Sequence, residues 1–272
     1  MRIGNREFDT KNYTYIMGIL NVTPDSFSDG GKFNSPDKAL LRAQEMIVQG
    51  ADIIDIGGES TRPGFTPLTA QEEMDRVLPV IEVIRKEFDI PISLDTSKAA
   101  VAREGIKAGA DLINDIWGLR RDPDMAKVIA DGGVCCCLMH NREQSEYGDF
   151  EKDVLKDLEH SLDIAAEAGI DYSKIILDPG IGFAKTYEQN LWMMANLECM
   201  HTFGLPVLLA ASRKSVIGLT LDLEKEKRLE GTLATSVVGV MKGCSFVRVH
   251  DIEENVRAVK MALTIRREQK KD

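Results

Sequence analysis

A repeated unit constrains the fold of this chain more than any other feature of its sequence. Each unit is a short apolar run, a polar or glycine-rich loop and an amphipathic stretch with helical periodicity, and it occurs eight times. Apolar runs without strict polar alternation are typical of parallel strands covered on both faces. The runs are Tyr15–Val22, Asp52–Gly57, Ile90–Asp95, Asp111–Ile116, Val134–His140, Lys174–Asp178, Leu205–Ala211 and Ser245–His250. The pattern predicts an α/β protein with eight parallel strands.

Helical stretches fill the intervals between these runs. The stretch Thr69–Phe88 opens with a capping box formed by Thr69 and Glu72, and Pro36–Gln49 has Pro in its first turn after Ser35. The other predicted helices are Lys98–Ala108, Pro123–Ala130, Phe150–Ala168, Tyr187–Thr202, Lys225–Lys242 and Glu253–Arg266. No break in composition separates the units, so we expect one domain over residues 1–272.

A (β/α)8 TIM barrel is the fold class that eight such units predict, and the length of 272 residues suits it. A doubly wound open sheet is the alternative. That fold usually has a glycine fingerprint after its first strand, and no G-x-G-x-x-G opens a helix here. The segment Arg2–Asp9 is expected to form a small hairpin across Gly4-Asn5 that plugs the bottom of the barrel.

Charge and composition exclude several classes of partner. The net charge of −10 argues against general nucleic-acid binding, which requires a basic face. No apolar run reaches the roughly 20 residues of a membrane helix, and the N-terminal segment lacks the apolar stretch of a signal peptide. Cys135, Cys136 and Cys137 are expected to be small buried side chains of a strand, because alternate residues face opposite sides. We expect a cytoplasmic protein with no membrane partner.

Polar residues stand where the apolar runs end, which is where a barrel builds its active site. Each has an ordinary explanation alone, because Asp before a helix is usually a cap and Asp-Pro-Gly is a common turn. Burying many polar groups without partners is costly, however, and these converge on one end of the fold. The joint pattern predicts one pocket centred on Asp95, Asn114, Asp178 and Lys214.

Some neighbouring polar residues are expected to lie outside this centre. Asn114 and Asp115 point to opposite faces of their strand, so at most one faces the interior. Asp55 lies deeper in its run, which favours a structural role. Arg213 is expected to be solvated beside Lys214, and His140 alone is weak evidence of function.

The residue types suggest three subsites. The centre of the pocket offers carboxylate and amide acceptors with one cationic donor, which suits a flat heterocycle with several N–H donors and a carbonyl. Arg62, Arg248 and His250, near Asn21, suit anionic oxygens, since Arg presents a planar fork to phosphate. Asn21 could bind Mg²⁺ held on that phosphate. Ser215 is expected to open a helix and bind a carboxylate.

These segments resemble the dihydropteroate synthase family. The loops Met17–Gly31 and Ile54–Gly64 look like the two signatures of that family, and the shorter motifs follow in family order. They are Ser93-Leu-Asp-Thr-Ser97, Ile113-Asn-Asp-Ile116, Leu138-Met-His140, Leu177-Asp-Pro-Gly180, Ser212-Arg-Lys-Ser215 and Arg248-Val-His250. The resemblance covers the chain from about Met17 to Asp251.

The resemblance implies a homodimeric, Mg²⁺-dependent enzyme of folate biosynthesis that sulfonamides inhibit. It would join 6-hydroxymethyl-7,8-dihydropterin diphosphate to 4-aminobenzoate and release diphosphate. The pterin would be bound by Asp95, Asn114, Ile116, Met139, Asp178, Lys214 and Arg248. The diphosphate would be bound by Asn21, Thr61, Arg62, Arg248 and His250, with Asn21 at the metal. The aminobenzoate would be bound by Phe27, Pro63, Phe183, Lys214 and Ser215.

The implied mechanism begins with departure of diphosphate, which leaves a cationic methylene on the pterin. Asp95, Asp29, Lys214 and Arg248 would act in catalysis, and the carboxylates among them would stabilise that cation. The loops Thr23–Asn34 and Glu59–Leu68 would close over the site and exclude water.

Three departures from the family pattern and two rival functions accompany this expectation, and the run Cys135-Cys136-Cys137 is one of the departures. Ala210 stands where many relatives have Gly, and Phe65 lies in a variable part of the second loop. A methyltetrahydrofolate–corrinoid methyltransferase is one rival, but it has no use for a diphosphate-binding loop or for Ser212-Arg-Lys-Ser215. A pterin-binding protein without catalytic activity is the other rival, although Asn21, Arg62, Arg248 and His250 are all retained.

Overall fold

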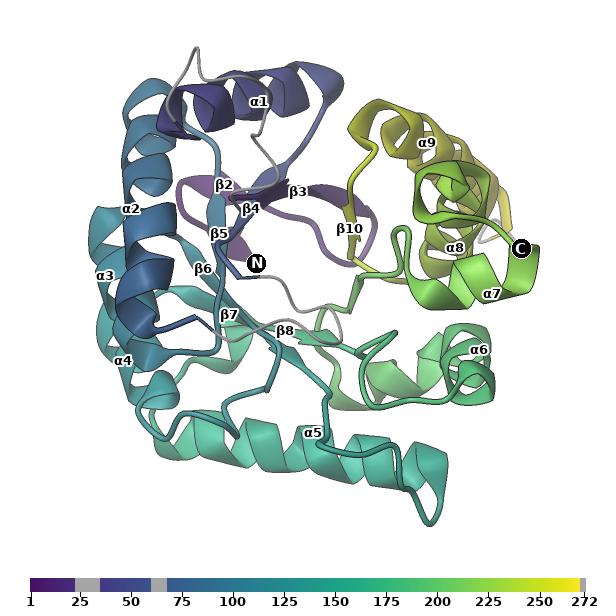
Figure 1. Cartoon of the computed structure of the whole chain (residues 1–272). Coiled ribbons are helices and arrows are strands. Elements are labelled where there is room, and N and C mark those ends of the chain that lie inside the picture. Colours follow the sequence, from purple (N-terminus) through teal and green to yellow (C-terminus); the bar gives the residue numbers. More distant parts are fainter. Residues whose placement is uncertain (23–34, 60–67, 270–272) are drawn as a thin grey trace.

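The computed structural model describes residues 1–22, 35–59 and 68–269. Eight parallel strands form a sheet in the order β8-β7-β6-β5-β4-β3-β10-β9. They are β3 (Tyr15–Asn21), β4 (Ile53–Gly57), β5 (Ile92–Asp95), β6 (Leu112–Asp115), β7 (Cys135–Met139), β8 (Ile175–Asp178), β9 (Leu208–Leu209) and β10 (Phe246–Val249). A parallel bridge between Leu177 and Val207 joins the two ends of this sheet. The predicted (β/α)8 barrel is confirmed, with its helices arranged around the strands (Figure 1).

The helices agree with the predicted stretches, with two differences. They are α1 (Ser35–Gln49), α2 (Ala70–Glu87), α3 (Ala99–Ala108), α4 (Met125–Gly132), α5 (Phe150–Glu167), α6 (Tyr187–Ala195), α7 (Ser215–Leu221), α8 (Leu229–Met241) and α9 (Ile252–Gln269). The stretch predicted over Tyr187–Thr202 is divided at Asn196, whose backbone is not helical, and continues as a 3-10 helix. The stretch predicted from Lys225 becomes α-helical only at Leu229. The predicted capping box of Thr69 and Glu72 is present.

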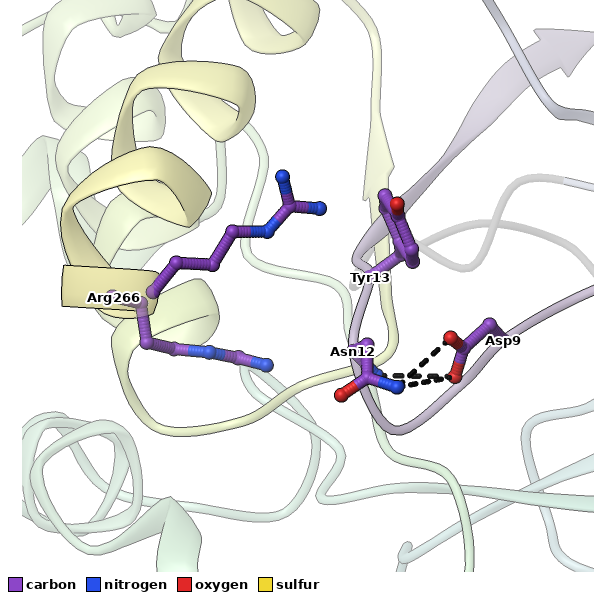
Figure 2. A pocket seen from close by; sticks show the side chains of 5 residues that line it. Asp9, Asn12, Tyr13 and Arg266 are labelled. Carbon is purple, nitrogen blue, oxygen red and sulfur yellow. Dashed lines mark hydrogen bonds between the residues drawn. The ribbon is translucent and has the colours of Figure 1, made fainter. Parts of the chain in front are cut away.

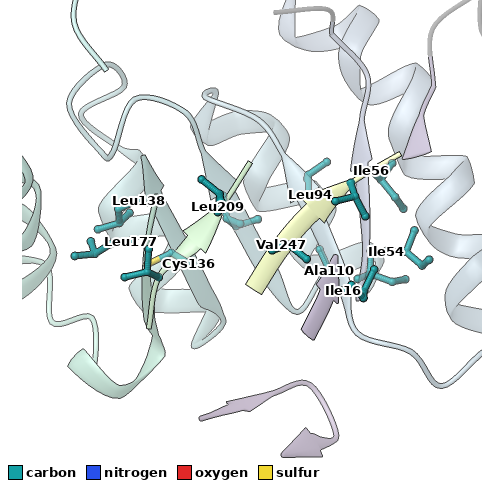
Figure 3. Close-up of a cluster of buried hydrophobic side chains, with 14 of the residues drawn as sticks. Ile16, Ile54, Ile56, Leu94, Ala110, Cys136, Leu138, Leu177, Leu209 and Val247 are labelled. Carbon is teal, nitrogen blue, oxygen red and sulfur yellow. The ribbon is translucent and has the colours of Figure 1, made fainter. Parts of the chain in front are cut away.

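Strand alternation divides the apolar side chains between two cores. The outward set, which includes Ile54, Leu94 and Leu177, packs against the helices, and Figure 3 shows it between strands and helices. The inward set, which includes Met17 and Phe246, fills the lower barrel. No helix in the described part of the chain combines the length and apolar character needed to cross a membrane.

The predicted N-terminal hairpin is confirmed as the floor of the barrel. Strands β1 (Arg2–Ile3) and β2 (Arg6–Glu7) pair antiparallel. Ile3 and Phe8 are buried within the inward core, and the Phe8 ring lies edge-on to Tyr15 with the centroids 4.8 Å apart. The chain's own first residues therefore close the end of the barrel opposite the strand C-termini.

The three adjacent cysteines follow the same alternation. Cys135 and Cys137 belong to the inward core and Cys136 to the outward core, and all three are buried. Burial raises the pKa of the Cys135 thiol to about 11. The three side chains therefore act as small apolar residues of the core, as the sequence predicts.

A cavity of about 300 Å³ lies between the segment that precedes β3 and the C-terminal part of α9 (Figure 2). It is lined by Asp9, Asn12, Tyr13, Arg266 and Arg267. The Arg266 guanidinium donates to the backbone oxygen of Val240 at 2.6 Å. None of these residues belongs to the predicted site, so this cavity is distinct from it.

The buried floor makes a stability prediction. Ile3→Ala should lower the free energy of unfolding by about 2–5 kcal/mol, because it removes buried methyl groups and leaves a cavity. Urea unfolding followed by circular dichroism measures this. Val48→Ala is the matched control, because Val48 is 81% exposed and a surface change of this kind alters stability by about 0.5 kcal/mol or less. Equal stability of the two variants would contradict the role of the hairpin as a packed floor.

Candidate active site

The barrel interior changes from apolar to polar along each strand. On β4 the inward positions run Ile53, Asp55, Gly57, and on β8 Ile176 is followed by Asp178. Neighbouring strands are in register, so that Gly57 pairs with Asp95 and Asp95 with Asn114. The two-residue period of the strands thus gathers polar side chains at the C-terminal end of the barrel.

Three side chains, those of Asp55, Arg248 and Asp95, form a row of ion pairs in the barrel interior, called here the ion-paired chain. Arg248 donates from Nε to Asp55 Oδ2 and from Nη2 to Asp95 Oδ2, both at 2.6 Å. The second oxygen of Asp55 accepts from Ser93 Oγ at 2.5 Å. Asp55 is fully buried, and the side chains of Arg248 and Asp95 are 16% and 15% exposed. Arg248 is therefore fixed from two sides.

The charges of this cluster do not balance. Three carboxylates, those of Asp55, Asp95 and Asp178, lie with the cations of Arg248 and Lys214. Burial raises the pKa of Asp95 well above its ordinary value; Arg248 opposes this shift, and Asp55 adds to it. Burial also raises the pKa of Asp178, opposed chiefly by Lys214. The site is therefore suited to a ligand that donates protons or carries positive charge.

Lys214 follows β9, the strand that pairs with the Arg248 strand β10. It is the residue before α7, and its Nζ donates to the backbone oxygen of Ile181 and lies 4.6 Å from the centre of the Phe183 ring. Burial lowers the pKa of Lys214 to about 8, and the attraction of Asp178 opposes this shift. The structure thus brings Lys214, Asp178 and Phe183 together.

Of the adjacent pair on β6, Asn114 faces the interior. Asp115 instead accepts from the backbone nitrogens of Trp117 at 2.9 Å and Leu119 at 2.7 Å, and so holds the turn after the strand. Met139 is buried at the end of β7, opposite Asp178, and Ile116 is half-buried. Ala210 belongs to the apolar layer of the lower interior.

Asn21 and His250 lie at the C-terminal ends of β3 and β10, which are neighbours in the sheet. His250 Nδ1 lies 3.0 Å from Ser212 Oγ. A side chain on Gly57 would lie 3.8 Å from Asp95 Oδ2 and 3.9 Å from Asn21 Oδ1, so the missing side chain leaves space between these two oxygens. No group of three His, Cys, Asp or Glu able to hold a metal occurs among the described residues.

Several predicted residues lie outside the described ranges. They are Phe27, Asp29, Thr61, Arg62, Pro63 and Phe65. Of the aminobenzoate residues, the structure describes half-buried Phe183 and exposed Ser215, which opens α7 as predicted. Glu59 and Leu68 flank the second gap, and the Leu68 nitrogen donates to Glu59 Oε1 at 3.3 Å.

The expectation for Arg213 is wrong. Arg213 is not a solvated loop residue, because its guanidinium makes two hydrogen bonds to Asp251, at 3.0 Å and 2.5 Å. Its backbone oxygen accepts from Arg228 at 3.0 Å and its nitrogen donates to Thr232 Oγ1 at 3.0 Å. These contacts hold the loop that presents Lys214. The partners are distant in the sequence, so local reasoning could not find them.

The sequence also did not single out Ser93 or Lys185, and it gave Asp55 only a structural role. The signal for Asp55 and Ser93 was available, because each stands two residues before an inward position at the strand end, Gly57 or Asp95. Lys185 lies within the irregular loop between β8 and α6 and has no such signal.

Known proteins resemble this chain along nearly its whole length. The family described as pterin binding enzyme matches residues 17–250. The chain belongs to the pterin-binding enzyme family. The dihydropteroate synthase of Clostridium beijerinckii is 59% identical over 96% of this chain and 97% of its own length. That of Bacillus subtilis is 60% identical over 92% of this chain and 88% of its own length.

Solved structures of this pterin-binding family share the barrel. A dihydropteroate synthase from Clostridium difficile, crystallised in the presence of pteroic acid, is 50% identical and covers 95% of this chain and 99% of its own, with a TM-score of 0.93. A Yersinia pestis dihydropteroate synthase in complex with a sulfonamide drug is 42% identical. It covers 98% of this chain and 99% of its own, with a TM-score of 0.92.

The fixed position of Arg248 leads to a second stability prediction. Asp55→Asn keeps the shape of the side chain but leaves Arg248 with one carboxylate, and breaking a buried pair in this way costs about 3–5 kcal/mol. Chemical unfolding measures the loss.

The matched control is Asp131→Asn, because Asp131 pairs with Lys127 at 2.9 Å on the exposed surface of α4. Exposed pairs contribute little. An Asp55→Asn protein as stable as this control would rule out the ion-paired chain as a structural element.

Proposed function

We propose that this protein is a dihydropteroate synthase, which joins 6-hydroxymethyl-7,8-dihydropterin diphosphate to 4-aminobenzoate in folate biosynthesis. The observation that carries the proposal is the gathering of Asp95, Asn114, Asp178 and Lys214 at one end of a barrel of the pterin-binding family. The high identity to enzymes named for this reaction supports it.

The pterin is recognised by carboxylate and amide acceptors that face its N–H groups. Asp95, Asn114 and Asp178 lie on β5, β6 and β8, so they approach a flat ring from different directions. Lys214 donates to its acceptor atoms. Met139 and Ile116 cover one face of the ring, and Arg248 lies against the other with its orientation fixed by Asp55.

The diphosphate binds beside the pterin, at the ends of β3 and β10. Asn21 and His250 contact it, together with Thr61, Arg62 and Arg248. Asn21 also offers the amide oxygen that would hold Mg²⁺, an ion that prefers few protein oxygens together with those of substrate phosphates. When bound, the metal neutralises charge on the departing diphosphate. Arg248 keeps a positive charge here at all working pH values.

The excess negative charge of the cluster serves the next step. The C–O bond to diphosphate breaks and leaves a cationic methylene on the pterin, which Asp95, with Asp29 of the first loop, stabilises electrostatically. The free amine of 4-aminobenzoate attacks the methylene and then loses a proton. Phe183, Phe27, Pro63 and the Lys214 stem shape this subsite, and the Ser215 hydroxyl binds the carboxylate. Sulfonamides would occupy the same place.

The reaction itself is the direct test. With the dihydropterin diphosphate, 4-aminobenzoate and Mg²⁺ present, the protein should release diphosphate and form 7,8-dihydropteroate, measured by chromatography. Removing Mg²⁺ with a chelator should abolish turnover, and adding it back should restore it. No diphosphate release under conditions where a known synthase works would reject the proposal, and pterin binding without turnover would favour a non-catalytic pterin-binding protein. Methyl transfer from methyltetrahydrofolate to a corrinoid protein would favour the methyltransferase.

Lys214 gives a residue-level prediction. Lys214→Ala removes a half-buried donor that the proposal places close to both substrates, so kcat/KM should fall by roughly a hundredfold, as expected for the loss of a hydrogen bond from a charged group and of packing. Steady-state kinetics with each substrate varied measures this. Lys152→Ala is the control, because Lys152 is exposed and pairs only with Asp149 of its own helix turn among the ion pairs of the described chain. Normal turnover by Lys214→Ala would remove Lys214 from the site.

The protein is further proposed to act as a homodimer in the cytoplasm. Exposed apolar side chains occur on α7, α8 and α9, which lie together on one side of the barrel (Figure 1): Leu219, Leu221, Val238, Met261 and Ile265. Such patches are typical of protein interfaces. The five cysteines are free thiols, as expected in a reducing compartment.

Light scattering should give twice the chain mass of 30.2 kDa at micromolar concentration. Met261→Asp places a charge in the proposed interface and should shift the mass toward the monomer, whereas Val48→Asp on α1 should not. A wild-type monomer would exclude the dimer.

A further inference from the structure

The loop between β8 and α6 folds around the ammonium of Lys185. Lys185 Nζ lies 2.8 Å from His140 Nδ1, 3.0 Å from the oxygen of Gly180 and 3.2 Å from the oxygen of Phe183. An ammonium has three N–H donors. Two of them bond carbonyl oxygens of this loop, and the third bonds His140, which follows β7. The side chain turns back into the protein and holds two of the loop's own carbonyls.

His140 connects this lysine to the helix layer. Its Nδ1 accepts from Lys185, so its proton is on Nε2, which lies 3.1 Å from Asp157 Oδ2 on α5. Burial lowers the pKa of His140 to about 4, which keeps the imidazole neutral. Asp157 is held in turn by Arg142 Nε at 2.6 Å. A continuous chain of polar contacts therefore runs from α5 across the end of β7 to the loop.

The same loop sets the positions of two pterin-site residues. The nitrogen of Gly180 donates to Asp178 Oδ1 at 2.7 Å. The oxygen of Ile181 accepts from Lys214, and the ring of Phe183 lies beside the Lys214 ammonium. Both the hydrogen bond of Lys214 Nζ and its contact with an aromatic ring are thus made with this loop.

The loop is also packed closely against the end of β7. Gly180 has φ +71°, and a side chain there would lie 2.0 Å from the backbone oxygen of His140. The two segments therefore touch backbone to backbone, and a shift of one moves the other. Lys185 spans this contact, because it bonds both His140 and Gly180.

We propose that Lys185 is a positioning residue of the pterin site, which holds the β8–α6 loop in the shape that directs Asp178 and Lys214 into the barrel. The inference rests on the proposed function for the identity of the ligand. Burial lowers the pKa of Lys185 to about 7, opposed chiefly by the charge of Asp178, which is consistent with the closeness of the two groups. Lys185 acts through these residues and not on the reacting atoms.

Lys185→Met tests this, because it removes the three donors and keeps an unbranched apolar stem. The KM for the dihydropterin diphosphate should rise roughly ten- to hundredfold, as expected when hydrogen bonds from a charged group are lost. Lys174→Met is the matched control. Lys174 also donates to a backbone oxygen, that of Gly133 at 2.6 Å, but it precedes β8 at the opposite end of the barrel. The Lys174→Met protein should therefore keep the wild-type KM for the dihydropterin diphosphate.

A double-mutant cycle with Lys214→Met separates positioning from general destabilisation. If Lys185 acts through Lys214, the two substitutions together should cost clearly less than the sum of their separate effects. Full additivity would overturn the proposal, and so would a Lys185→Met protein with wild-type KM. Lys185→Gln, whose amide keeps two N–H donors, should show an intermediate loss, and it decides the role of Lys185 if Lys185→Met does not fold.

Calorimetry with the dihydropterin diphosphate gives a second measurement that does not require turnover. The affinity of Lys185→Met should fall by the same factor as its KM rises. If the wild-type protein binds this pterin but releases no diphosphate, the proposed function fails, while the comparison of affinities still decides the role of Lys185. Equal affinity of the wild type and Lys185→Met would overturn the proposal on its own.

Discussion

The rest of the site depends on the ion-paired chain of Asp55, Arg248 and Asp95. It lies where the barrel interior changes from packed apolar side chains to polar ones, so it forms the boundary between the stable core and the reactive end. The Arg248 guanidinium donates to both Asp55 and Asp95, which fixes its orientation, and the site holds more carboxylates than cations. Fixed geometry and excess carboxylates therefore come from one arrangement, and the proposed reaction through a cation uses both.

Much of the fold follows from local sequence, because strand period and helix caps are local properties. The eight strands, the floor hairpin and the capping box at Thr69 were all predictable on this basis. The predictions that failed were those for residues whose conformation or exposure the local sequence does not determine. Asn196 interrupts a stretch with helical periodicity, and Arg213 looks solvated until Asp251, far along the chain, is placed beside it.

The candidate site divides in the same way. Asp95, Asn114 and Asp178 end strands, so their convergence could be read from the order of the runs. Asp55 stands at a position of β4 that faces the barrel interior. Its partner Arg248 is 193 residues away in the sequence, so the ion pair can be recognised only in the folded structure. Lys185 could not be predicted at all, since its importance depends on the path of a loop that returns to the end of β7.

The barrel floor has a consequence for the order of folding. The ring of Phe8 lies 5.8 Å from that of Phe246 on the last strand, so the floor is complete only when the two ends of the sequence have met. Contacts so distant in the chain are slow to form, because a long loop must close before any energy is gained. The inner core should therefore be among the last parts of the molecule to exclude water, after the outer layer between strands and helices has assembled.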